Sequence, residues 1–101
     1  MDIRLQYFDG CSSWQTTYKL LREVLDELGQ TTVEPVLERL DSPEEAERRH
    51  FVGSPTVLFD GRDPFAGSET TYGLACRVYT TPDGLAGSPT KQQLRAVLAG
   101  L

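Results

Sequence analysis

The chain has 101 residues, of which 39% are hydrophobic and 25% are charged, and these values fit one globular domain and leave no room for two. Its formal net charge of −5 excludes the clustered basic face of a nucleic-acid binder and docking by charge on an anionic membrane. No run approaches the roughly 20 apolar residues that span a bilayer, and the N-terminus lacks the basic-then-apolar order of a signal peptide. We therefore expect a single domain over residues 1–101, located in the cytoplasm.

The first two predicted elements are a strand and an amphipathic helix. Residues 3–7 alternate between apolar and polar side chains, which is typical of a strand. Ser12 or Ser13 can cap a helix, in which apolar residues then recur at helical spacing as far as Leu28. Gly29 is the residue type that commonly ends a helix.

A second strand and a short helix follow. Residues 31–40 are rich in β-branched and apolar side chains, and Pro35 predicts that this strand lies at an edge of the sheet because proline cannot donate a ladder hydrogen bond. The run Ser42-Pro43-Glu44-Glu45 is a capping box with proline at the first helical position. We expect the helix to continue to about His50 and to end by Gly53.

The C-terminal half predicts two strands and a last helix. Residues 54–61 read as a buried strand that ends in a tight turn, and residues 61–72 as a loop. Residues 74–80 predict a fourth strand, and residues 81–88 predict a loop that contains Pro-Asp-Gly. A second capping box at the start of residues 90–101 predicts the terminal helix.

This order, β-α-β-α-β-β-α, predicts an α/β fold with a central four-stranded mixed sheet flanked by helices. The first β-α-β unit gives parallel strands through a right-handed crossover. We expect the fourth strand to run antiparallel to the third. Its two sides would hold alternate residues: Leu74, Cys76 and Val78 on one side, and Ala75, Arg77 and Tyr79 on the other.

Two segments carry a family resemblance. Cys11-Ser12-Ser13-Trp14 stands at the start of the first helix, and Gly53-Ser54-Pro55-Thr56 opens the third strand. Together with the order of elements, they resemble the thioredoxin-like superfamily, in which a C-x-x-C or C-x-x-S cysteine faces a cis-proline. The resemblance implies a thioredoxin-like fold, a reactive Cys11, a cis peptide bond before Pro55, and a substrate chain positioned as an added strand by Ser54, Pro55 and Thr56.

A narrower resemblance is to small bacterial proteins described only as "thioredoxin family", some of which lie near mercury- or arsenic-resistance functions. It is carried by three runs of sequence: residues 8–11, 53–58 and 73–79. The chain departs from the dithiol pattern because Trp14 stands where the resolving cysteine would be, so the motif is C-x-x-W. Turnover through a C-x-x-C pair is therefore excluded. Trp14 either packs in the core or forms a wall over the thiol that shapes the approach of a substrate.

The two cysteines are the candidate catalytic residues. A thiolate at a helix N-terminus is stabilised by unpaired amides and by the helix dipole, so Cys11 is either a nucleophile of lowered pKa or a buried, inert side chain. Cys76 is either a distant resolving partner or a core cysteine. A bridge between them requires Cα atoms within about 7 Å of each other.

Three functions follow as hypotheses. The first is a thiol-disulfide oxidoreductase or monothiol transferase that uses Cys11 as nucleophile and is resolved by Cys76 or by an external thiol. The second is a cysteine-based binder of soft metal or metalloid ions, and the third is a non-catalytic adaptor. We expect no cofactor and no structural zinc site, because two cysteines and one histidine cannot supply its ligands. The expected partners are a protein or a low-molecular-weight thiol or disulfide, without nucleic acid or membrane, and the sequence leaves the oligomeric state open.

Overall fold

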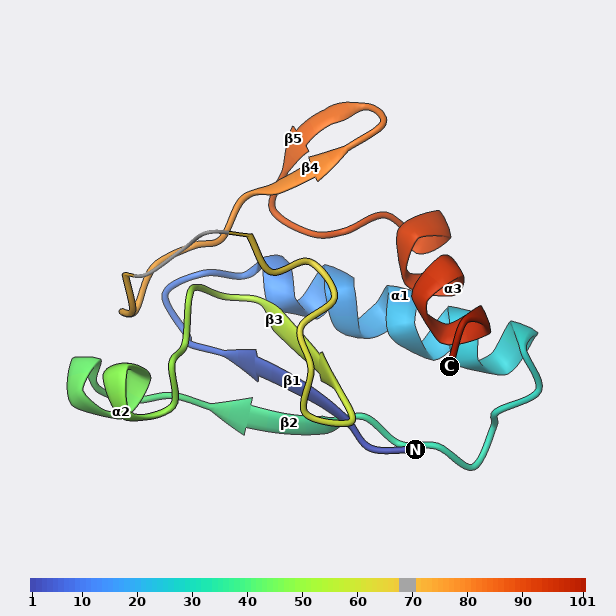
Figure 1. Ribbon diagram of the computed structural model, residues 1–101, viewed down its shortest axis with the longest axis horizontal. Helices are drawn as coiled ribbons and strands as arrows, with labels where there is room; N and C mark the ends of the chain where they lie inside the picture. The colour runs from blue at the N-terminus through green and yellow to red at the C-terminus, as the bar shows by residue number, and fades with distance from the viewer. Residues whose placement is uncertain (68–70) are drawn as a thin grey trace.

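The computed structural model describes residues 1–67 and 71–101 of the chain. These residues form three helices and five strands, whose arrangement can be followed in Figure 1. In chain order they are β1 (Ile3–Tyr7), α1 (Ser13–Glu27), β2 (Val36–Arg39), α2 (Pro43–Arg48), β3 (Thr56–Phe59), β4 (Tyr79–Thr81), β5 (Gly84–Ala86) and α3 (Lys91–Ala99).

The main sheet has the strand order β2-β1-β3. β1 runs parallel to β2 and antiparallel to β3, so that Leu5 lies opposite Leu37 on one side and Val57 on the other. β2 is at the edge of the sheet, which confirms the position that Pro35 predicts. The parallel pair β1 and β2 is joined through α1, as the predicted β-α-β unit requires.

The prediction of a central four-stranded mixed sheet is wrong. The main sheet has three strands, and β4 and β5 form a separate two-stranded sheet. The thioredoxin-like fold that the resemblance implies is therefore not shown. In place of a fourth strand antiparallel to β3, the segment 74–78 makes one isolated parallel bridge, between Cys76 and Ser54. Of the predicted loop 61–72, residues 68–70 lie outside the described residues.

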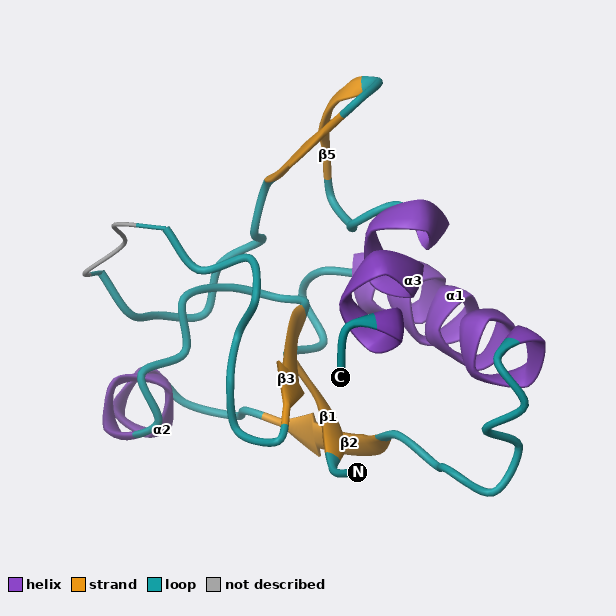
Figure 2. Ribbon diagram, turned by 45° about the vertical axis from the view of Figure 1, so that its right-hand side comes forward, coloured by secondary structure: helices purple, strands orange, loops and turns teal. Residues whose placement is uncertain are grey.

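A local hairpin takes the last two residues of the expected fourth strand, Tyr79 and Thr80, together with part of the expected loop 81–88. The Thr81 hydroxyl donates to the carbonyl of Gly84 at 2.6 Å and accepts from the amide of Asp83 at 3.2 Å. Gly84 has φ of +106°, a conformation that glycine adopts without steric cost. β4 therefore pairs with β5 rather than with β3, and the hairpin projects from the body of the protein (Figures 1 and 2).

The main core lies between one face of the three-stranded sheet and the helices α1 and α3. Figure 2 shows both helices on the same side of the sheet. Strand periodicity brings every second residue of β1 and β3 to this face. The buried members of this core are Ile3, Leu5, Leu21, Val24, Leu25, Val57, Phe59, Leu94 and Leu98. A smaller cluster of Leu40, Ala46 and Phe51 holds α2.

The helix ends form much as the sequence predicts. The Ser42 hydroxyl accepts a hydrogen bond from the amide of Glu45 at 3.1 Å, with proline at the start of α2. At α3 both bonds of the capping box are present between Thr90 and Gln93. Gly29 follows α1 with φ of +75°. Satisfying the free amides of the first turn is what makes these short helices begin where they do.

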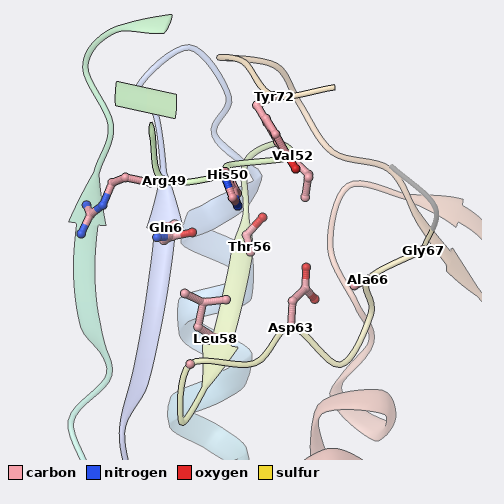
Figure 3. Close-up of a pocket in the computed structure, with 11 residues that line it drawn as sticks. Gln6, Arg49, His50, Val52, Thr56, Leu58, Asp63, Ala66, Gly67 and Tyr72 are labelled. Atoms are coloured by element: carbon pink, nitrogen blue, oxygen red, sulfur yellow. The ribbon is translucent and has the colours of Figure 1, made fainter. Parts of the chain in front are cut away.

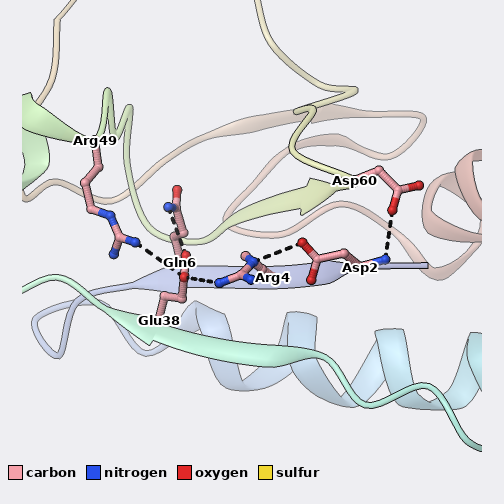
Figure 4. A network of polar contacts seen from close by, with 6 residues as sticks. All are labelled: Asp2, Arg4, Gln6, Glu38, Arg49 and Asp60. Atoms are coloured by element: carbon pink, nitrogen blue, oxygen red, sulfur yellow. Dashed lines mark hydrogen bonds and ion pairs between the residues drawn. The ribbon is translucent and has the colours of Figure 1, made fainter.

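A polar network lies on the sheet face that points away from α1 and α3 (Figure 4). Glu38 of β2 accepts hydrogen bonds from Arg4 at 2.7 Å, from Gln6 at 3.2 Å and from Arg49 at 3.4 Å. Its side chain is 12% exposed. Burial raises the pKa of Glu38, but the hydrogen bonds from Arg4 and Gln6 and the charge of Arg49 outweigh burial and hold this pKa below its ordinary value of 4.5.

This network makes the stability of the fold depend on pH. Because the folded-state pKa of Glu38 is lowered, its carboxylate stabilises the fold fully above about pH 4.5, and this contribution is lost as the pH falls through the folded-state pKa. We expect Glu38→Gln to lower the free energy of unfolding at pH 7 by roughly 1–2 kcal/mol. Urea unfolding at pH 7 and pH 3 should show this difference shrinking at the lower pH.

The matched control is Glu47→Gln on the exposed side of α2, which should change stability little at either pH. A difference between wild type and Glu38→Gln that stays constant from pH 7 to pH 3 would contradict the role assigned to the carboxylate.

Candidate functional site

The two cysteines that the sequence singles out are joined by a disulfide bond. Their Cα atoms lie 5.7 Å apart, although the residues are separated by 65 positions in the chain. This distance lies within the range that a disulfide spans. The fold thus brings together Cys11, which precedes α1, and Cys76, which precedes the β4–β5 hairpin.

Cys11 lies in the short connection between β1 and α1. Its amide donates to the carbonyl of Phe8 at 3.4 Å, and the amide of Phe8 donates to the Ser54 hydroxyl at 3.3 Å. Ser12 is the N-cap residue of α1, but its side chain makes no capping hydrogen bond, and the first turn holds no acidic residue. The amide of Gln15 in this turn donates to the carbonyl of Ser12 at 3.1 Å, and the helix dipole favours negative charge near this helix start. Cys11 itself is only 8% exposed.

Cys76 is fixed by the backbone pairing of its two neighbours. The amide of Ser54 donates to the carbonyl of Ala75 at 2.8 Å, and the amide of Arg77 donates to the carbonyl of Ser54 at 2.9 Å. Cys76 is exposed to solvent, whereas Arg77 is buried. Of the residues expected on the same side as Cys76, Val78 is 63% exposed.

Arg77 anchors the segment that carries Cys76, and it is the residue that the sequence reasoning missed. Its guanidinium donates to the Asp63 carboxylate at 2.6 Å, to the Thr56 hydroxyl at 3.2 Å and to the carbonyl of Phe65 at 2.8 Å. It also lies 4.5 Å from the centre of the Tyr79 ring. An arginine placed among apolar residues in a strand-like run was the available signal, because such a residue is buried only when it is paired.

The predicted substrate-binding residues of the third strand are buried. Ser54, Pro55 and Thr56 all lie in the interior, and the Ser54–Pro55 peptide bond is cis, as the resemblance implies. The Thr56 hydroxyl donates to the carbonyl of Gly53 at 2.6 Å, and the Pro55 carbonyl accepts from the hydroxyl of Tyr79. The polar atoms that would meet a substrate are therefore bonded within the chain.

Trp14 follows the packing alternative. It is half-buried, and its ring stacks on that of Tyr7, with 4.1 Å between the ring centres. It also packs against the main core. Trp14 therefore joins the first turn of α1 to the end of β1, next to the connection that holds Cys11.

A hollow of about 360 Å³ lies on the sheet face that α1 and α3 leave open (Figure 3). Gln6 and Leu58 of the sheet line it, together with His50, whose ring stacks on Tyr72 at 4.8 Å between centres. Thr56 also lines the hollow, whereas neither cysteine does. The hollow and the disulfide are thus separate features of the molecule.

Comparisons with family models, with curated proteins and with solved structures return no match for this chain. The resemblance to the thioredoxin-like superfamily stays an expectation from the sequence. Within residues 1–67 and 71–101, no helix has both the length and the apolar character needed to cross a membrane. In the same residues, no group of three or more His, Cys, Asp or Glu side chains is placed to hold a metal ion.

The buried ion pair gives a direct test of how the Cys76 segment is held. Arg77→Met leaves the Asp63 carboxylate, 13% exposed, without its partner, and breaking such a pair is costly. We expect a loss of about 3 kcal/mol in the free energy of unfolding, measured by urea denaturation of the oxidised protein.

The control for this variant is Arg95→Met, which removes an exposed ion pair with Glu27 and should cost less than about 1 kcal/mol. Equal losses in the two variants would show that Arg77 does not anchor the segment.

Proposed function

We propose that Cys11 and Cys76 form a thiol-disulfide exchange centre, and that the protein is a thiol-disulfide oxidoreductase or thiol transferase. The observation that carries this proposal is the bridge itself, which joins the chain's two cysteines across 65 positions. One of them lies at the start of a helix and the other on an exposed segment. The first position favours a thiolate and the second is an exposed residue, and both thiolate character and access raise the rate of thiol-disulfide exchange.

The position of Cys11 at the start of α1 supports its role as a stabilised thiolate. When the bridge is reduced, the amides at the start of α1 and the helix dipole favour the thiolate of Cys11 over its thiol. No acidic side chain in the first turn opposes this. A non-catalytic adaptor would instead leave the pKa of Cys11 near the ordinary thiol value of about 8.5.

The backbone hydrogen bonds between Ser54 and the neighbours of Cys76 support Cys76 as the second cysteine of the exchange centre. Trp14 occupies the place of a resolving cysteine one turn into the helix, so the second sulfur must come from elsewhere in the chain. The two backbone hydrogen bonds of Ser54 hold Cys76 beside Cys11. The reaction balances when the dithiol reduces a substrate disulfide: the protein disulfide forms, and the substrate leaves as two thiols.

We also propose a cytoplasmic location, since the chain has two cysteines, whereas small secreted domains are rich in disulfides. In that reducing compartment a bridge such as Cys11–Cys76 is usually transient and serves chemistry or sensing. A permanent structural bridge would be the expectation outside the cell.

An equilibrium redox titration tests the proposal. The protein is equilibrated over glutathione buffers of graded ratio, its free thiols are alkylated, and the cysteine peptides are identified by mass spectrometry. We expect a linked Cys11–Cys76 peptide with one midpoint, and loss of all disulfide reductase activity in Cys11→Ser.

Two results would contradict exchange as the function. The first is a bridge that stays closed in the most reducing buffer, which is the behaviour of a structural disulfide with a potential below about −300 mV. The second is full reductase activity in Cys11→Ser.

The convergence of two thiols also favours a second candidate, a binder of a soft metal or metalloid ion. Reduction of the bridge frees two sulfur ligands whose Cα atoms lie 5.7 Å apart, and thiolates select soft ions. We expect arsenite to bind the reduced protein at one ion per chain in a calorimetric titration. Affinity should fall at least tenfold in both Cys11→Ser and Cys76→Ser, and equal affinity in the single variants and the wild type would reject this candidate.

A further inference from the structure

The two cysteines of the bridge differ in their exposure to solvent. Cys11, in the connection between β1 and α1, is 8% exposed, whereas Cys76 is an exposed residue. A thiolate that opens a disulfide must approach one of its sulfur atoms, and access is one of the factors that decide which one is attacked. The exposure of the two residues therefore favours an approach from the side of Cys76.

We propose that external partners exchange at Cys76, that Cys11 is the internal resolving thiolate, and that the partner is a low-molecular-weight thiol or disulfide. This inference rests on the proposed exchange function and deepens it. It reverses the roles that the sequence suggests, in which Cys11 meets the substrate and Cys76 resolves.

The reduction of the bridge can be written in two balanced steps. The thiolate of a small thiol attacks the sulfur of Cys76, so that a mixed disulfide forms there and the electron pair of the broken bond leaves on Cys11. A second small thiolate then attacks the small-molecule sulfur of the mixed disulfide. The small disulfide is released, and the two electrons lost by the two small thiols reside on the thiols of the protein. In the opposite direction, Cys76 attacks the small disulfide and Cys11 resolves.

The leaving group supports attack at Cys76. A thiolate leaves faster when its thiol has a lower pKa, and Cys11 would leave at the start of α1, where the Ser12 side chain makes no capping bond and the first turn has no acidic residue. Cys76 lies between Ala75 and Arg77, in a segment that is not the start of a helix. Attack at Cys11 would have to reach a buried residue and would expel the thiolate of Cys76, which belongs to no helix N-terminus.

The backbone beside the bridge favours a small partner over a protein chain. The resemblance implies that a protein substrate would dock as an added strand along Ser54, Pro55 and Thr56. Both backbone groups of Ser54 are already bonded to Ala75 and Arg77, and the buried pair of Arg77 and Asp63 holds that segment in place. A small thiol needs to reach only the bridge at the exposed residue Cys76 and does not compete for these hydrogen bonds.

The test uses the oxidised wild-type protein, so that no variant has to fold. Reduced glutathione is added, the reaction is stopped at short times with excess N-ethylmaleimide, and each cysteine peptide is identified by mass spectrometry. We expect glutathione on Cys76 and maleimide on Cys11, with the reverse pattern at least tenfold rarer.

Each other outcome has a distinct meaning. Glutathione on Cys11 with maleimide on Cys76 would overturn the assignment of roles and leave the exchange function standing. An unopened bridge, without an adduct on either cysteine, would overturn the exchange function together with the assignment.

The size of the partner is tested with the same readout. An extended ten-residue peptide with one central cysteine is compared with glutathione at equal thiolate concentration. We expect the peptide to open the bridge no faster than glutathione does. A rate at least tenfold higher for the peptide would show that a chain docks beside the bridge, and would overturn the small-molecule partner.

Discussion

A guanidinium in a protein interior needs a carboxylate and further acceptors around it, and Arg77 finds them in Asp63, Thr56 and the carbonyl of Phe65. This requirement fixes the segment 75–77 against the residues at the start of β3. The two backbones approach closely at Gly53, which has φ of +137° and where an added Cβ would lie 3.2 Å from the Cα of Arg77. The position of Cys76 follows from this anchor, because Cys76 directly precedes Arg77 in the chain.

The parts of the fold that depend on local sequence were predictable. Alternation marks β1, Pro35 places β2 at the edge, and the hydroxyls of Ser42 and Thr90 cap their helices. These features depend on neighbouring residues only, so a pattern of a few positions is enough to indicate them. Gly84 could also have been interpreted as a hairpin turn instead of as part of a loop, since Asp-Gly is a common turn pair in hairpins.

The prediction of a fourth strand was wrong. The alternation of side chains along residues 74–80 can be interpreted with either side of the segment facing the interior. Hydrophobicity alone groups Cys76 with Leu74 and Val78 as a buried side. In the structure the opposite side of the segment faces the interior, because Arg77 and Tyr79 are buried. The burial of Arg77 depends on Asp63, a partner 14 positions away in a different loop. A charge pair over that distance leaves no periodic signal. The same long-range contact leaves Cys76 exposed. The sequence therefore identified the two cysteines of the candidate site but not which of them is exposed to solvent.

The candidate site consequently combines elements that fold for different reasons. The helix start next to Cys11 is set by the amphipathic pattern of α1 and by the packing of Trp14 on Tyr7. The segment at Cys76 is set by electrostatics. Asp63 and Thr56, which accept hydrogen bonds from Arg77, also line the hollow on the open sheet face.

The bridge also closes a covalent loop of 65 positions that contains α1, β2, α2 and β3. In the chain-entropy treatment a cross-link over this length removes enough conformations from the unfolded chain to be worth about 4 kcal/mol, a large share of the stability of a domain of this size. Reduction releases that restraint. Proteases that cut transiently opened chains act on the unfolded population, so the reduced protein would be degraded sooner than the oxidised one, and the redox state of its surroundings would set its lifetime.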